Sequence, residues 1–186
     1  MAAAEILLAV WFFLPAYVAN PVAALLGGGT PVDFGRSLRD GHRVLGAGKT
    51  WRGLAGGIGT GVVLGFLLHV AGSAVSPALS FGPGLAAAGT AIVLLAVGAL
   101  LGDLAGAFTK RRLGKARGAP VLGLDQYDFV AGAIAVLLLV DRDWWLARYW
   151  QGDAIYGLAL IIVITPLLHR AVNILGYRMG TKREPW

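Results

Sequence analysis

Acidic and basic side chains converge in one stretch of an otherwise apolar chain, residues 102–128. Asp103 stands near the end of one apolar run, and Asp125 and Asp128 begin the next. The last two are three residues apart, a spacing that places both side chains on one face of a helix. Carboxylate oxygens are the ligands that a hard cation such as Mg²⁺ prefers. The stretch therefore predicts a metal site with Asp103, Asp125 and Asp128 as its ligands.

Five cations lie between these acids, and such side chains neutralise the oxygens of a polyphosphate. They are Lys110, Arg111, Arg112, Lys115 and Arg117. Two interpretations stay open at this point. The stretch is either a binding site for Mg²⁺ and a polyphosphate, or a solvated loop whose cations only fix the orientation of the chain in a membrane.

A second basic stretch, residues 27–52, ends in Gly48-Lys49-Thr50. It is not a P-loop, because Arg43 stands where that motif needs its first glycine and no strand precedes it. A Gly-Lys-Thr turn that leads into a helix N-terminus still binds phosphate through backbone N–H groups and the lysine. Lys49, Thr50 and Arg52 are therefore predicted to bind substrate; the alternative for the two cations is that they extend towards the membrane surface.

Two further polar residues are candidates for substrate binding. Asn20 precedes Pro21, which is expected to end or kink the first helix and to leave carbonyl groups free in the site. Asp33 lies in the stretch 27–52, where it is either a substrate ligand or an ordinary loop residue.

The composition is that of a polytopic membrane protein. Of the 186 residues, 57% are hydrophobic and only 14% charged, and the mean hydropathy is +0.70. Backbone groups in lipid must be paired within the protein, so the apolar segments are predicted to be helices. The fold class is therefore all-α, with about five transmembrane helices. The segments are residues 4–26, 51–72, 85–108, 126–140 and 154–176.

The cations also predict the orientation. All of the 16 lysines and arginines except Arg142 and Arg148 lie in residues 27–52, in 109–125 or towards the C-terminus. With five helices, the positive-inside rule places the N-terminus outside and both basic loops in the cytoplasm. The net charge of +6 thus indicates a membrane face and anionic substrates rather than nucleic acid. An aromatic belt on the outer side is expected from Trp144, Trp145 and Trp150.

Two glycine stripes predict close helix packing. One comprises Gly53, Gly57, Gly61 and Gly65; the other comprises Gly98, Gly102 and Gly106. If the stripes face each other, Arg52 comes near Asp103.

Three motifs together resemble a family of CTP-transferases of phospholipid synthesis, which includes bacterial phosphatidate cytidylyltransferases and archaeal CDP-archaeol synthases. The motifs are GKTWRG at 48–53, GDLAGAFTKR at 102–111 and DQYD at 125–128. The chain departs from the bacterial pattern where Arg52 replaces an acid, Ala107 a serine and Gln126 an arginine. These departures favour the archaeal branch.

The resemblance implies one transmembrane cytidylyltransferase domain over residues 1–186, with Lys110 and Arg111 joining the three acids in catalysis. The implied reaction is Mg²⁺-dependent transfer from CTP to unsaturated archaetidic acid (2,3-bis-O-geranylgeranylglycerol 1-phosphate), giving CDP-archaeol and pyrophosphate. The partners would be CTP, this lipid phosphate and the membrane lipids, and the active site would lie on the cytoplasmic face.

Two other functions compete with this enzyme. A transporter would place its ionisable groups near the bilayer midplane, often in repeated units, whereas the helix acids here stand at the predicted cytoplasmic edge. Phosphotransferases that consume CDP-lipids begin with D-G-x-x-A-R, but Asp40-Gly41 is followed by Val44 and Leu45 at the last two positions.

Overall fold

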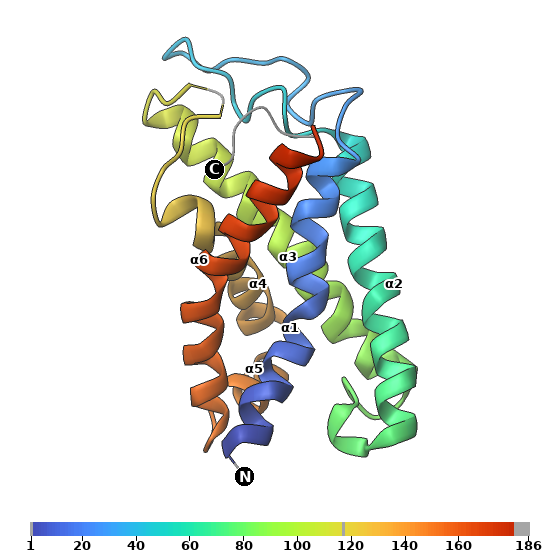
Figure 1. Cartoon of the computed structure of the whole chain (residues 1–186). Helices are drawn as coiled ribbons and strands as arrows, with labels where there is room; N and C mark the ends of the chain where they lie inside the picture. The colour runs from blue at the N-terminus through green and yellow to red at the C-terminus, as the bar shows by residue number, and fades with distance from the viewer. Residues whose placement is uncertain (1, 117, 181–186) are drawn as a thin grey trace.

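The computed structural model describes residues 2–116 and 118–180, and within these ranges the regular elements are all helices (Figure 1). The predicted all-α fold is confirmed. Arg117, Lys182 and Arg183, which contributed to the predicted orientation, lie outside the described residues. The helices are α1 (Ala2–Leu25), α2 (Trp51–Val75), the 3-10 turn η1 (Pro77–Leu79), α3 (Gly84–Arg112), α4 (Leu124–Val140), α5 (Arg142–Tyr149) and α6 (Ala154–Arg178).

The chain runs up and down the bundle, so its connections collect at two ends (Figure 1). The connection 26–50 and the described residues between α3 and α4, 113–116 and 118–123, lie at one end together with the last turn of α6. We call this the loop end. The start of α1, η1 and α5 lie at the opposite end, which we call the N-terminal end. Both basic loops are therefore on the same side of the bundle, as the cation pattern predicts.

Four helices are long and apolar enough to cross a membrane: α1, α2, α3 and α6. The predicted fifth span, residues 126–140, lies in α4, which has only 17 residues. At a rise of 1.5 Å per residue α4 is about 25 Å long, shorter than the roughly 30 Å of a bilayer core. The predicted count of five was thus one too high by length, and α4 and α5 together carry the chain back across the bundle.

The two glycine stripes pack against different helices. A side-chain carbon at Gly57 would stand 2.5 Å from the Ala19 carbonyl oxygen of α1 and 2.9 Å from Leu100 of α3. A side-chain carbon at Gly98 would stand 2.8 Å from Ala133 of α4. The stripes therefore do not face each other: the first joins α2 to α1 and α3, and the second joins α3 to α4.

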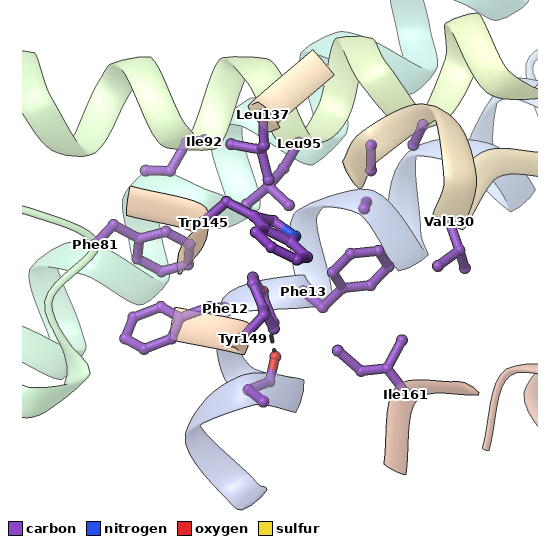
Figure 2. Close-up of a cluster of buried hydrophobic side chains, with 14 of the residues drawn as sticks. Phe12, Phe13, Phe81, Ile92, Leu95, Val130, Leu137, Trp145, Tyr149 and Ile161 are labelled. Carbon is purple, nitrogen blue, oxygen red and sulfur yellow. Dashed lines mark hydrogen bonds between the residues drawn. The ribbon is translucent and has the colours of Figure 1, made fainter. Parts of the chain in front are cut away.

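Buried aromatic and aliphatic side chains from five elements fill the bundle towards the N-terminal end (Figure 2). Phe12 and Phe81 meet edge to face with ring centroids 5.0 Å apart. Trp145 is only 7% exposed and belongs to the buried core, so the expected aromatic belt is wrong at this position. Its ring stacks on Trp150. Trp150 remains half exposed. This core holds α5 and the neighbouring helices in fixed register.

Candidate active site

Asp33 organises the loop between α1 and α2 and does not line a cavity. Its carboxylate accepts hydrogen bonds from the Gly35, Leu45 and Gly46 N–H groups at 2.8–3.0 Å, and from the Arg43 guanidinium at 2.5 Å. The side chain is 0% exposed. Burial alone would raise the pKa of this carboxyl, but the hydrogen bonds from Arg43 and the backbone lower it well below the usual range. Of the two predicted roles of Asp33, these contacts support that of a loop residue over that of a substrate ligand.

The end of this loop is fixed where α2 begins. Thr50 is the N-cap of α2, and its buried hydroxyl oxygen accepts a hydrogen bond from the Gly53 N–H at 3.2 Å. The exposed Arg52 donates to the Leu26 and Gly27 carbonyl oxygens at 2.8 and 2.5 Å. Arg52 therefore anchors the end of α1. Its expected proximity to Asp103 depended on the two glycine stripes facing each other, and they do not.

Lys49 and Lys110 each form an ion pair with one predicted metal ligand. The Lys49 Nζ lies 2.5 Å from Asp103 Oδ2, and the Lys110 Nζ lies 2.5 Å from Asp125 Oδ1. The other Asp125 oxygen accepts a hydrogen bond from the Val121 N–H at 3.0 Å. All four charged side chains keep between 16% and 29% exposure, so they are accessible from the cavity described below.

Asp128 is brought to the same place by the α3 glycines. A side-chain carbon at Gly106 would overlap the Asp128 carboxylate, and one at Gly102 would overlap the Asp128 carbonyl oxygen. These positions must stay glycine for α3 and α4 to approach this closely. The contact explains why Asp103 and Asp128, which are far apart in sequence, line one cavity.

The connection that follows α3 is held by the arginines at the end of this helix. Arg111 donates to the Lys115 and Ala116 carbonyl oxygens at 2.7 and 3.4 Å. Arg112 pairs with Asp40, in the connection between α1 and α2, at 2.6 Å, and it donates to the Arg43 carbonyl oxygen at 2.7 Å. Arg112 thus ties the two basic loops together, a role that the charge pattern alone does not reveal.

The acids and lysines line one end of a cavity of about 610 Å³. The charged lining residues are Lys49, Asp103, Lys110, Arg111, Asp125 and Asp128. The rest of the wall comes mainly from apolar side chains of α1 and α6, among them Leu14, Val18, Leu168 and Val172. The cavity is therefore amphipathic: charged where α3, α4 and the loops meet, and apolar between α1 and α6.

Asn20 lines this cavity and, with Lys49, Thr50 and Asp103, a smaller adjoining pocket of about 60 Å³. Pro21 does not end α1, which continues to Leu25.

The structure thus brings together most of the predicted site. It gathers Asp103, Asp125, Asp128, Lys49, Lys110, Arg111 and Asn20 around the cavity and Thr50 around the adjoining pocket. Asp33 and Arg52 line neither of them. The sequence interpretation missed the polar part of the α6 wall, which includes Thr165 and Asn173, both buried. These residues sit singly in an apolar helix, and only their burial marks them.

The donor chemistry fits Mg²⁺, although the acids do not form a finished metal site. Within residues 2–116 and 118–180, no three acidic, histidine or cysteine side chains are grouped closely enough to hold an ion. Magnesium usually takes one or two carboxylates and completes its shell with phosphate oxygens and water. Asp103, Asp125 and Asp128 on one cavity wall satisfy that requirement once a phosphate is present.

Comparison with known proteins decides the family. A family model described as CarS-like, CDP-archaeol synthase, matches residues 3–186. The chain belongs to the CDP-archaeol synthase family. The CDP-archaeol synthase of Methanoculleus marisnigri is 49% identical over 177 residues, covering 93% of this chain and 99% of the relative. That of Halorubrum lacusprofundi is 47% identical over 178 residues and covers 96% of each.

A solved structure of an intramembrane enzyme for archaeal membrane lipid biosynthesis shares the fold of this CDP-archaeol synthase family member. It is 37% identical, with a TM-score of 0.68, and the match covers 91% of this chain and 94% of the other. These findings confirm the predicted resemblance, its archaeal branch and the predicted class of enzyme, a CTP-dependent nucleotidyltransferase of the membrane. They select that class over a transporter or a phosphotransferase that consumes CDP-lipids.

Proposed function

We propose that this protein transfers the cytidylyl group of CTP to 2,3-bis-O-geranylgeranylglycerol 1-phosphate and releases CDP-archaeol and pyrophosphate. The observation that carries the proposal is the amphipathic cavity. Its charged end suits a nucleoside triphosphate and a lipid phosphate. Its apolar walls on α1 and α6 suit two isoprenoid chains. A single site of this shape accommodates a water-soluble and a membrane-embedded substrate together.

The lipid phosphate supplies its own nucleophile. A phosphomonoester has a second pKa of about 6, so at neutral pH it already carries a nucleophilic oxyanion. One of its oxygens forms a bond to the α-phosphorus of CTP, and the bond from that phosphorus to the bridging oxygen of pyrophosphate breaks. No proton has to be removed, so the protein accelerates the step by positioning the two phosphates and neutralising their charge.

The two lysine–aspartate pairs are the groups that would change partners when substrate binds. Asp103, Asp125 and Asp128 would hold Mg²⁺, which supplies charge neutralisation at the phosphates. Lys49 and Lys110 are then free to donate to phosphate oxygens. Their present distances of 2.5 Å to the carboxylates support this role, because both ammonium groups already stand where the charge has to be balanced.

The remaining predicted residues divide into two groups. Arg111 and Asn20 line the cavity and are proposed to contact substrate directly, as is Thr50 from the adjoining pocket. Asp33 and Arg52 act through the backbone: one folds the first basic loop and the other holds the end of α1.

The loop end is proposed to face the cytoplasm, because it carries most of the cations and the positive-inside rule applies. The chain has no cysteine, so single cysteines can be introduced without removing others. Ala78→Cys at the N-terminal end and Lys115→Cys at the loop end should react with an impermeant thiol reagent from opposite sides of sealed vesicles. Labelling from the same side would contradict this orientation.

The function is tested with purified protein in lipid bilayers, radiolabelled CTP and Mg²⁺. We expect label in the lipid fraction with the geranylgeranyl lipid phosphate and equimolar release of pyrophosphate. A panel that includes diacyl phosphatidic acid would define the lipid class. Failure to label any lipid phosphate would overturn the proposal.

The lipid route has its own test. Val18→Trp places a large ring on the α1 wall of the cavity and should lower kcat/KM for the lipid by about tenfold or more. Stabilisation by CTP and Mg²⁺ should persist. Val63→Trp is the matched control, because Val63 of α2 is 60% exposed outside the cavity. Equal effects of the two substitutions would exclude the α1 wall of the cavity as the binding surface of the lipid chains.

A further inference from the structure

Proline interrupts the hydrogen bonding of α6 at one point. Pro166 lies inside this helix and has no N–H group, so it cannot donate to the carbonyl oxygen of Ile162, four residues earlier. The Tyr127 hydroxyl of α4 donates to this oxygen at 2.7 Å. The carbonyl that the proline leaves without a helical donor is therefore satisfied from another helix.

The same region of α6 is held from a second side. The Tyr17 hydroxyl of α1 lies 2.8 Å from the Thr165 hydroxyl, which donates to the Ile161 carbonyl oxygen at 2.6 Å. Thr165 and Ile161 are both 0% exposed. The part of α6 around Pro166 is thus held between a tyrosine of α1 and a tyrosine of α4.

Tyr127 lies on the turn of α4 that bears the catalytic acids. Residues of an α-helix are about 100° apart, so Tyr127 points away from the face that Asp125 and Asp128 share. Asp125 reaches Lys110, Asp128 packs against Gly106 of α3, and Tyr127 reaches α6. This turn is therefore fixed by three contacts, of which Tyr127 supplies the one to α6.

The other end of this contact is the base of the cavity wall. Every α6 residue that lines the cavity is Thr165 or follows it in the sequence. Below that point α6 packs tightly on α1, where a side-chain carbon at Gly157 would overlap Ala9. The hydrogen bond from Tyr127 thus joins the acid-bearing turn to the place where α6 changes from packing on α1 to lining the cavity.

We propose that Tyr127 is a positioning residue that keeps the α6 wall of the cavity in register with Asp125 and Asp128. The inference rests on the proposed function, since it takes the α6 wall to hold the lipid and the two acids to act on the phosphates. Tyr127 touches neither substrate. It sets the position of the lipid phosphate relative to the acids through the carbonyl that Pro166 exposes.

The first experiment removes the hydroxyl. Tyr127→Phe should lower kcat by about three- to tenfold, the range for loss of one hydrogen bond. KM for CTP and stabilisation by CTP and Mg²⁺ should change less than twofold, because the lysines and acids remain. Tyr156→Phe is the matched control: this α6 tyrosine is 56% exposed, and the described part of the structure gives its hydroxyl no hydrogen-bond partner. An unchanged kcat in Tyr127→Phe would overturn the proposal.

The second experiment asks whether Tyr127 acts through the exposed carbonyl. Pro166→Ala restores an N–H that can bind the Ile162 carbonyl within α6, so Tyr127→Phe should cost less than twofold in that background. Pro166→Leu serves the same purpose if the alanine variant inserts poorly. Equal losses in kcat with and without the proline would overturn the proposal. Wild-type protein that labels no lipid phosphate would instead overturn the proposed function, so the two failures are distinguishable.

Discussion

The two ends of the bundle are held together by different kinds of contact. At the loop end, segments far apart in sequence are joined by ion pairs, such as Lys49 with Asp103 and Lys110 with Asp125. At the N-terminal end they are joined by rings and indole N–H groups: Trp144 donates to the Phe81 carbonyl oxygen at 2.5 Å.

Even the partly buried cation of the N-terminal end follows this pattern. The Arg148 guanidinium lies over the Phe12 ring, 4.5 Å from its centroid, and donates to the Ser80 carbonyl oxygen at 3.2 Å. Both partners are neutral, and Phe12 belongs to the core. Ion pairs beside a cavity can exchange their partners for phosphate and metal, whereas packed rings cannot. The comparison therefore separates an end built to rearrange from an end built to stay fixed.

The largest effect is expected from the acids at the loop end. Asp103→Asn, Asp125→Asn and Asp128→Asn keep the size of the side chain and remove its charge. Each should lower CTP incorporation by more than about tenfold, because metal and phosphate charge can no longer be balanced. Asp143→Asn, an exposed acid at the N-terminal end, is the control and should be neutral. Near-normal turnover in Asp125→Asn or Asp128→Asn with an unchanged melting temperature would contradict the proposed role of these acids in the reaction.

The lysines should follow with losses of about tenfold. Lys49→Met and Lys110→Met remove the ammonium that balances the phosphates and also leave Asp103 or Asp125 without its ion pair. Membrane insertion should be unaffected, which fractionation of the membranes checks. Lys115→Met provides the reference, because Lys115 is an exposed cation just after α3 at the same end of the bundle. If all three substitutions reduced kcat equally, the effect would reflect general surface charge rather than these two pairs.

A smaller loss is expected from the helix contact that aligns the acids. Gly106→Ala forces a side-chain carbon onto the Asp128 carboxylate, so α3 and α4 must separate. Turnover should fall several-fold, with a melting temperature lower by a few degrees. Gly59→Ala is a stringent control because no atom lies within 4 Å of the added carbon. Loss of melting temperature without loss of turnover in Gly106→Ala would show that the contact does not position Asp128.

The smallest effect on turnover is expected at the N-terminal end. Trp144→Phe removes the N–H that reaches Phe81 and should cost about 1 kcal/mol of stability. It should leave kcat/KM within twofold, since no substituted atom is near the cavity. Thermal unfolding and the incorporation assay measured on the same sample test both statements. A large fall in kcat/KM would mean that the fixed end also takes part in the reaction.

The charged half of the site was predictable from the sequence because charge is scarce in an apolar chain. Asp103, Asp125, Asp128 and the lysines were found in this way, and they line the cavity. Their pairing was not predictable. Lys49 meets Asp103, whereas Arg52 donates to carbonyl oxygens at the end of α1. Periodicity does not reveal which neighbour a glycine stripe will meet.

The apolar half of the site left no comparable signal. Thr165 and Pro166 interrupt an aliphatic run, and Tyr127 stands between Gln126 and Asp128. The roles of these three residues appear only when α4 and α6 lie side by side. Asp33 shows the opposite case, a charge that stood out in the sequence and that the loop itself uses. It was predicted as a possible substrate ligand because it is an acid in a basic loop, but its oxygens bind that loop. All-helical membrane architecture followed from composition. The predicted segment 126–140 agrees with α4, so the error lay in counting an element this short as a full span.

The short α4 gives the protein walls of unequal height. Its 17 residues rise about 25 Å, whereas α2 and α6, with 25 residues each, rise about 37 Å. Leu139, near its lower end, is 84% exposed, so lipid beside α4 meets a short apolar surface. Such hydrophobic mismatch costs fractions of a kcal/mol per ångström, and the bilayer or the helix must adjust. Because α4 also carries Asp125 and Asp128, thinner and thicker membranes are expected to support different rates.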